Sequence, residues 1–101
     1  DGGYVEFGNS KLKVIHTPGH TRGGVCLYSE EEENHFVITG DSLFAGSIGR
    51  TDLPGGDYDQ LMESLLGKLV RIGEDYRVLP GHGPETTIAT ELNTNPFLRY
   101  E

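Results

Sequence analysis

The chain has 101 residues, which is enough for one small domain over residues 1–101 and too few for two. Its composition, 35% hydrophobic and 24% charged, is that of an ordinary globular protein. The formal net charge of −8 argues against a nucleic-acid partner and against an anionic membrane surface, because both attract clustered basic residues.

The first 40 residues carry four stretches that are typical of β-strands. Apolar and polar residues alternate in Lys11–His16, and Tyr4–Phe7 is a further short strand candidate. Residues 24–28 and 35–39 follow, separated by the solvated acidic run Glu30–Glu33, and we expect them to form an antiparallel hairpin.

The second half predicts a helix from about Tyr58 to Ile72, with Asp57 as its N-cap and Gly73 at its end. Leucines spaced four apart give this helix a broad apolar face. A short strand at Tyr76–Leu79 and a last helix at about Thr87–Asn93, capped by Thr86, complete the order. We expect an α/β (α+β) fold with one mostly antiparallel sheet, helices on one face, and nothing to cover the second face.

Three loops, each directly after a predicted strand, present imidazole or carboxylate groups. They are HTPGHT at 16–21, TGDSLF at 39–44 and LPGHGP at 79–84. Strands that deliver such groups onto glycine-bounded turns are a usual way to build a fixed metal site. Spacing alone leaves the alternatives open, because a lone histidine near a turn is often solvated and an aspartate after glycine often bonds its own backbone.

These three motifs, in this order, resemble the second half of metallo-β-lactamase-fold hydrolases. The flanking runs SIGRTDLPGGDYDQLMESL and GHGPETTIATELNTNPFL resemble the short glyoxalase II-like (hydroxyacylglutathione hydrolase-like) subgroup. The resemblance covers nearly the whole chain. It implies that residues 1–101 are the C-terminal half of an αββα sandwich.

The resemblance also implies a two-metal site, with zinc as the expected metal and iron or manganese as possible replacements. The position of His20 would complete the ligands of one ion, catalytic Asp41 would bridge both, and His82 would serve the other. The implied activity is hydrolysis of a small-molecule thioester by a hydroxide held between the ions.

One family motif is absent. The HxHxDH run, which supplies two further ligands to each metal in the family, has no counterpart among the four histidines of this chain. The chain alone offers at most two ligands per metal, too few for a tight site. We therefore expect the isolated chain to be inactive and to pair with itself or with an N-terminal half, and the absence of a bound metal is one of the alternatives for the isolated chain.

Other candidate residues are secondary. Arg50 and Tyr58 are candidates for substrate binding. The alternatives are that Arg50 forms a structural ion pair with Asp52 or Asp57, and that Tyr58 packs at the start of the helix. His16 is expected to be structural and His35 to be an exposed hairpin residue. Cys26, the only cysteine, is expected in the core; it excludes an internal disulfide and favours a reducing, cytoplasmic location. Ser42 has no evident base.

Two alternative functions come from other classes. A persulfide dioxygenase of the same fold would use a single iron and matching ligands. A non-catalytic half-domain that self-associates is the third possibility. A β-lactamase is less favoured, since many carry Cys at the position of Asp41, and the acidic charge disfavours a nuclease.

Overall fold

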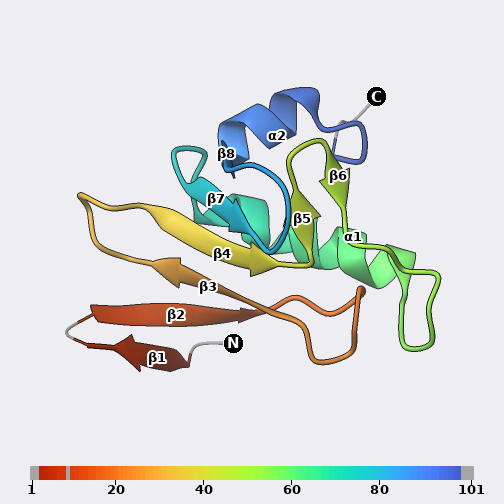
Figure 1. Ribbon diagram of the computed structural model, residues 1–101, viewed down its shortest axis with the longest axis horizontal. Coiled ribbons are helices and arrows are strands. Elements are labelled where there is room, and N and C mark those ends of the chain that lie inside the picture. The colour runs from red at the N-terminus through yellow and green to blue at the C-terminus, as the bar shows by residue number, and fades with distance from the viewer. Residues whose placement is uncertain (1–2, 9, 99–101) are drawn as a thin grey trace.

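The computed structural model describes residues 3–8 and 10–98, which form a twisted sheet with helices packed against it (Figure 1). The strands are β1 Tyr4–Phe7, β2 Ser10–His16, β3 Val25–Ser29, β4 Phe36–Gly40, β5 Leu43–Phe44, β6 Ser47–Ile48, β7 Arg77–Pro80 and β8 Thr86–Thr87. The helices are α1 Tyr58–Gly67, the 3₁₀ turn η1 Leu69–Ile72, and α2 Ile88–Thr94.

The main sheet has the strand order β1-β2-β3-β4-β7-β8, and β5 and β6 form a separate small hairpin. Every pairing in the main sheet is antiparallel except β4 with β7, which is parallel. This confirms the expected mostly antiparallel sheet. Because β2 and β4 are both antiparallel to β3, and β7 is parallel to β4, the carboxyl ends of β2, β4 and β7 meet at one edge of the sheet.

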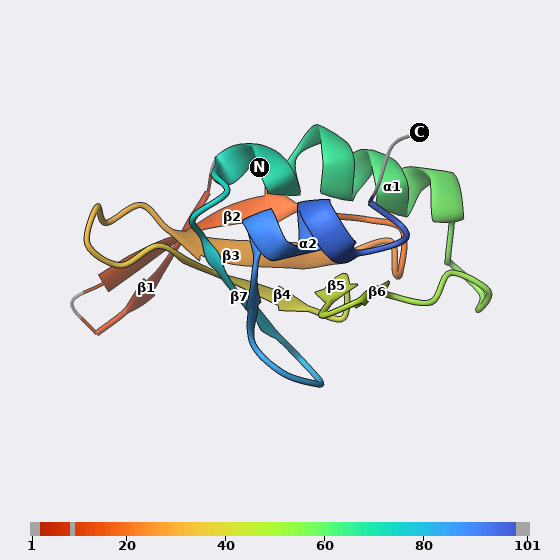
Figure 2. The ribbon, with the colours of Figure 1, turned by 90° about the horizontal axis from the view of Figure 1, so that it is seen from above.

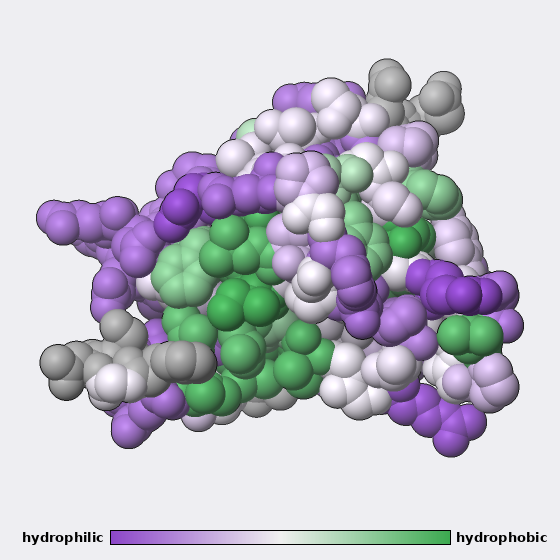
Figure 3. All heavy atoms as spheres, viewed as in Figure 1, coloured by the Kyte–Doolittle hydropathy of each residue, from purple (hydrophilic) through white to green (hydrophobic). Residues whose placement is uncertain are grey.

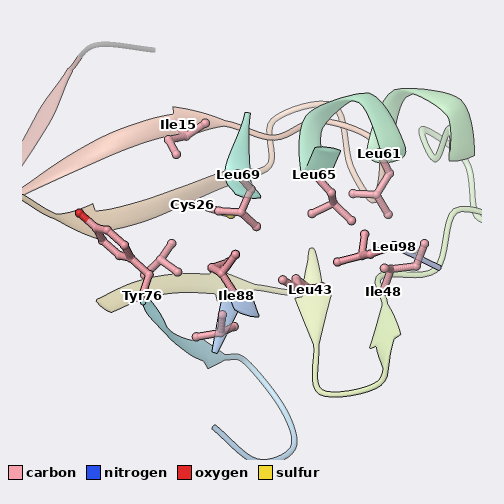
Figure 4. Packing of buried hydrophobic residues seen from close by; sticks show 12 residues of the cluster. Ile15, Cys26, Leu43, Ile48, Leu61, Leu65, Leu69, Tyr76, Ile88 and Leu98 are labelled. Carbon is pink, nitrogen blue, oxygen red and sulfur yellow. The ribbon is translucent and has the colours of Figure 1, made fainter. Parts of the chain in front are cut away.

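The core lies between the sheet and α1, which runs along one face (Figures 2 and 4). Leu61, Leu65 and Leu69 are fully buried there, as the spacing of the predicted apolar face requires. Each such side chain contributes about 1.5–3 kcal/mol through burial. No helix in the described ranges is long and apolar enough to cross a membrane.

Helix boundaries confirm part of the prediction and correct the rest. Asp57 is the N-cap of α1, and its side chain accepts a hydrogen bond from the Gln60 backbone N–H at 3.0 Å. The α-helix ends at Gly67, not at Ile72, because the backbone of Lys68 turns out of helical geometry and the chain continues as η1.

The prediction for the start of the last helix is wrong by one residue. Thr87 is the N-cap, and its hydroxyl accepts from the backbone N–H of Thr90 at 3.0 Å. Thr86 instead pairs with Val78 as part of β8, so its backbone belongs to the sheet.

The face of the sheet opposite α1 carries apolar residues in register. Val14, Leu27, Ile38 and Leu79 stand directly beside one another on β2, β3, β4 and β7. All four are partly exposed and none belongs to the core cluster. Figure 3, which looks onto this face, shows a continuous apolar area over these strands. We call these four residues the open face; within the described part of the chain, no element covers it.

Candidate metal centre

The three predicted loops meet at one edge of the sheet. His20 follows β2, Asp41 follows β4 and His82 follows β7, the three strands whose carboxyl ends coincide. The sheet therefore brings together groups that are 21 and 41 residues apart in the sequence. This juxtaposition follows from topology, which the sequence motifs alone do not give.

Asp41 lies between the two imidazoles. Its Oδ2 is 3.9 Å from His20 Nε2, and its Oδ1 is 3.2 Å from His82 Nδ1. The Asp41 side chain is 49% exposed and the His82 side chain 81% exposed, so the carboxylate is reachable from solvent. Each oxygen of one carboxylate thus faces a different histidine, which is the arrangement that a bridging ligand needs.

A backbone carbonyl orients His20. The Nδ1 atom lies 2.7 Å from the carbonyl oxygen of Arg50, in the loop after β6. Because a carbonyl can only accept, Nδ1 carries the proton and donates it. In the neutral ring Nε2 is then unprotonated, and its lone pair is the one directed to the Asp41 side. Metal-ligating histidines commonly have such an orienting partner.

Glycines allow the loops to approach closely. A Cβ on Gly49 would lie 2.0 Å from the Asp41 carbonyl oxygen, and one on Gly81 would lie 3.1 Å from Asp41 Oδ1. Gly19 has a φ of +136°, and a Cβ there would lie 2.3 Å from the Leu61 backbone. Side chains at these three positions would push the ligand-bearing loops apart.

The N-terminal part of α1 holds the His20 loop in place. The backbone N–H of Asp57 donates to the Gly19 carbonyl at 2.7 Å, and the Ser64 hydroxyl donates to the Pro18 carbonyl at 2.8 Å. Since α1 is anchored in the core, the loop is fixed to a rigid element.

The site opens into a groove of about 370 Å³. It is lined by His20, Asp41, Phe44, Ser47, Ile48, Gly49, Arg50 and His82. One wall is the β5–β6 hairpin, which the sequence analysis missed. Its strands have two residues each, too short for alternation to show; the available signal was Gly46, whose φ of +78° supports the turn between them.

Of the two predicted substrate-binding residues, the structure places Arg50 at the groove and Tyr58 outside its lining. Arg50 lies at the groove, but its guanidinium makes a two-pronged contact with Asp52, at 2.8 and 3.0 Å. This hydrogen-bonded ion pair lowers the pKa of the Asp52 carboxyl and raises that of Arg50. Tyr58, the first residue of α1, is 49% exposed and is not among the described residues that line the groove.

The remaining histidines lie outside the site. His16 Nε2 is 3.0 Å from the Arg22 carbonyl. The prediction that His35 is simply exposed is wrong: its Nδ1 lies 2.6 Å from Asp75 Oδ2, and its ring stacks on Tyr76 at 4.5 Å. A hairpin position gave no sign of these partners, which come from 40 residues further along.

Cys26 is a core residue, as predicted, with no exposed surface. Burial raises the pKa of its thiol, which opposes reactivity. Ser42 is also buried, and its hydroxyl lies 3.4 Å from that of Thr17. Neither side chain lines the groove as a nucleophile.

The donors suit a metal ion in kind but not in number. Imidazole nitrogens and a carboxylate are ligands for zinc, iron and manganese. However, the described residues contain no group of three or more His, Cys, Asp or Glu side chains that converges on one point. The described residues give one imidazole and one carboxylate oxygen on each side of Asp41.

Comparison with known proteins identifies the family. A model of the metallo-beta-lactamase superfamily matches residues 3–82. The chain belongs to the metallo-beta-lactamase superfamily.

Curated members of the superfamily are similar over nearly the whole chain. The probable metallo-hydrolase YqgX of Bacillus subtilis is 46% identical over 96 residues, which cover 95% of this chain and 44% of YqgX. The hydroxyacylglutathione hydrolase GloC of Haemophilus influenzae is 41% identical over 98 residues, covering 97% of this chain and 45% of GloC. The chain thus spans a little under half the length of these relatives.

Solved metallo-beta-lactamase structures confirm the fold. BLEG-1 B3 metallo-beta-lactamase superposes with a TM-score of 0.86 at 44% identity, covering 94% of this chain and 44% of that one. TTHA1623 in a di-iron-bound form gives 0.83 at 46% identity, covering 97% and 46%. ETHE1 from Myxococcus xanthus gives 0.85 at 34% identity, covering 94% and 42%. Members of the superfamily bind metal ions, and one of these neighbours holds two irons.

Proposed function

We propose that this chain supplies His20, Asp41 and His82 to a metal-dependent hydrolase that acts on thioesters of the hydroxyacylglutathione kind. The observation that carries the proposal is the position of Asp41, whose two oxygens face two different imidazoles at 3.9 and 3.2 Å. The similarity to GloC, a hydroxyacylglutathione hydrolase, supports the substrate class.

In this proposal the residues of the chain have separate roles in holding the metal ions, orienting a ligand and lining the groove. His20 and Asp41 Oδ2 would hold one ion, and His82 and Asp41 Oδ1 the other. When bound, such ions polarise a substrate carbonyl and make water nucleophilic near neutral pH. The Arg50 carbonyl keeps the His20 lone pair directed inward. Phe44 and Ile48 give the groove an apolar wall against which the acyl chain of a substrate can lie.

Arg50 and Tyr58 are proposed substrate contacts. The Arg50 guanidinium is 60% exposed and could receive an acidic group of the substrate, provided that this group displaces Asp52. Tyr58 begins the helix that supports the His20 loop, so it would contact only a substrate that extends beyond the groove.

A second candidate reaction is that of a persulfide dioxygenase with a single iron. The similarity to ETHE1, at 34% identity, supports this alternative reaction. The number and identity of the bound metal ions separate the two reactions, because the hydrolase proposal requires Asp41 to bridge two ions. Zinc is our first proposal, with iron and manganese as alternatives.

We further propose that the chain works only when paired, as half of a cytoplasmic enzyme. The open face is an apolar surface across four strands, which a protein in water tends to bury. The described residues also bring no group of three or more ligands together, and the relatives are more than twice as long as the matched region. A segment equivalent to the N-terminal half of GloC would cover the face and add the missing ligands; a second copy of this chain is the alternative.

The test is a zinc titration of the 101-residue chain followed by NMR of the imidazole groups, with and without the N-terminal half of GloC. We expect His20 and His82 to respond before His16 and His35, and zinc binding to tighten when the partner half is present. Thioester hydrolysis should appear only in the mixture and should be lost in Asp41→Asn.

Three outcomes would each contradict one of these proposals: the metal site, the hydrolase reaction or the pairing with an N-terminal half. Equal response of all four histidines would remove the metal site. Metal binding in the mixture without thioester hydrolysis, but with oxygen-dependent persulfide consumption, would favour the dioxygenase. If light scattering shows a homodimer whose mass does not change when the N-terminal half is added, the chain is a self-associating half-domain.

A further inference from the structure

A second groove lies at the other end of the core from the metal centre. It has a volume of about 640 Å³, within the range of small-molecule sites, and opens between η1 and the α1 side of β2 and β3. Its defining residues are Lys13, Tyr28, Lys68, Arg71, Ile72 and Tyr76, and we call it the basic groove. Figure 4 shows Tyr76 at the end of the core away from Leu43 and Ile48, and Ile48 lines the metal centre.

Positive charge is concentrated at this groove although the protein is acidic. Three of the eight Lys and Arg residues line it, in a chain with a net charge of −8. Among the described residues that line the groove there is one carboxylate, that of Glu30, which lies 3.9 Å from Lys13 Nζ. At that distance, with both side chains partly exposed, the pair is weak, and the three cations outnumber the carboxylate among the described lining residues.

The cationic groups differ in how they are held. Lys68 Nζ donates to the His16 carbonyl at 3.0 Å, which fixes its head group beside β2. Arg71 is exposed on η1, and none of the described residues makes a hydrogen bond or ion pair with its guanidinium. A guanidinium that no described side chain or backbone group engages has donors left for an oxyanion, which it can bind in a bidentate way.

The floor of the groove is aromatic and rigid. Tyr28 and Tyr76 meet edge to face, with centroids 5.9 Å apart. The Tyr76 hydroxyl donates to the Ser29 carbonyl at 2.6 Å, and His35 stacks on its ring. A floor held from three directions loses little conformational freedom when a ligand packs on it.

We propose that the basic groove is a binding site for a small organic phosphate, separate from the metal centre. Arg71, Lys68 and Lys13 hold the phosphate, and Tyr28, Tyr76 and Ile72 contact the carbon part of the molecule. Three cations that line one groove match a dianion better than a monoanion, which favours phosphate over carboxylate. Lys13 and Tyr28, which pair across β2 and β3, lie on the face of the sheet opposite the open face, although Val14 of the open face also lines the groove.

The test is a titration of the 101-residue chain with phenyl phosphate, followed by amide NMR, which also reports whether each variant is folded. Resonances of Tyr28, Arg71 and Ile72 should shift with a saturable curve, and phenol should cause no such shift. Arg71→Gln should weaken binding about tenfold, because hydrogen bonds to charged groups are the strong ones. Arg22→Gln makes the same change of charge outside the groove and should leave the affinity unchanged.

A second variant separates the phosphate from the carbon contacts. Tyr28→Leu should weaken phenyl phosphate and leave inorganic phosphate unchanged. The proposal is wrong if no groove resonance shifts at about 10 mM phenyl phosphate. It is also wrong if Arg22→Gln weakens binding as much as Arg71→Gln, because binding would then follow net charge and not the groove.

Discussion

Replacing Gly49 by alanine tests whether close backbone approach builds the metal centre. Gly49 follows β6 directly, is buried, and donates its N–H to the Ser42 carbonyl at 3.0 Å. An added Cβ would lie 2.0 Å from the Asp41 carbonyl oxygen and 3.2 Å from His20 Cβ, whereas ordinary contact begins at 3.4 Å. The Asp41 backbone and the β6 strand must therefore separate by about 1.4 Å, the difference between those distances.

That movement is large for a metal site. Ligands must be held to within about 0.5 Å of their working geometry, so a shift of this size moves Asp41 out of reach of one imidazole or the other. Overpacking of a tight site costs about 1–3 kcal/mol in the free energy of unfolding. Disturbing the support of metal ligands lowers metal affinity by about 10–100-fold.

Two measurements check this prediction. Urea denaturation should show the loss of stability, and a zinc titration followed at the His20 and His82 resonances should show the loss of affinity. Gly23→Ala is the matched control, because Gly23 has no left-handed φ and an added Cβ there meets nothing within 4 Å. If Gly49→Ala binds zinc as the parent chain does, the strain is relieved away from Asp41 and the reasoning fails.

Three further predictions concern stability. Glu91 is 2% exposed and its carboxylate accepts three hydrogen bonds, which Glu91→Ala removes. The free energy of unfolding, measured by urea denaturation, should therefore fall by about 2–4 kcal/mol. Glu91→Gln should lower it by less. The hydrogen bond from His35 lowers the pKa of the Asp75 carboxyl in the folded state. Its contribution to the free energy of unfolding is therefore present above the unfolded-state pKa of about 4 and is lost as pH falls through the folded-state pKa. Denaturation at pH 7 should therefore show Asp75→Asn to be less stable than the parent chain, and the two should converge near pH 2. Gly67→Ala, in open space at the end of α1, should raise the melting temperature with a gain of about 0.5–1 kcal/mol.

Much of the fold could be predicted because it depends on local patterns. The leucine spacing of α1 reports which side of the helix meets the core, and the alternation in Lys11–His16 reports a strand, although its residue in the core cluster is Ile15. The N-cap at Asp57 is also local, since cap and acceptor are three residues apart. The site residues could be proposed for a different reason: the motifs that carry His20, Asp41 and His82 resemble those of metallo-β-lactamase-fold hydrolases. Their role as ligands stays a prediction.

The parts that the sequence did not show depend on contacts between distant backbone atoms. The partner that orients His20 is the carbonyl of Arg50, which any residue would provide, so no side-chain signal marks it. Glu91 has the character of an exposed helical residue, yet the β5–β6 turn approaches it and the Gly46 N–H donates to its carboxylate at 2.8 Å. Such groups are recognised only after the chain has folded, because their partners come from 30 to 45 residues away.

If the chain is half of a paired enzyme, as we propose, the small number of ligands among the described residues and the open face have one cause, and this makes a quantitative prediction. If the missing ligands and the cover of the open face come from the same segment, metal binding and pairing are linked equilibria. Linkage requires that pairing raises zinc affinity by the same factor by which zinc raises pairing affinity. Both factors can be measured with the N-terminal half of GloC, by zinc titration at saturating partner and by partner titration at saturating zinc. Ile38→Thr on the open face should weaken pairing while leaving the fold of the chain intact, and it should reduce zinc affinity only when the partner is present. Unequal factors would mean that the segment covering the face is not the one that completes the site.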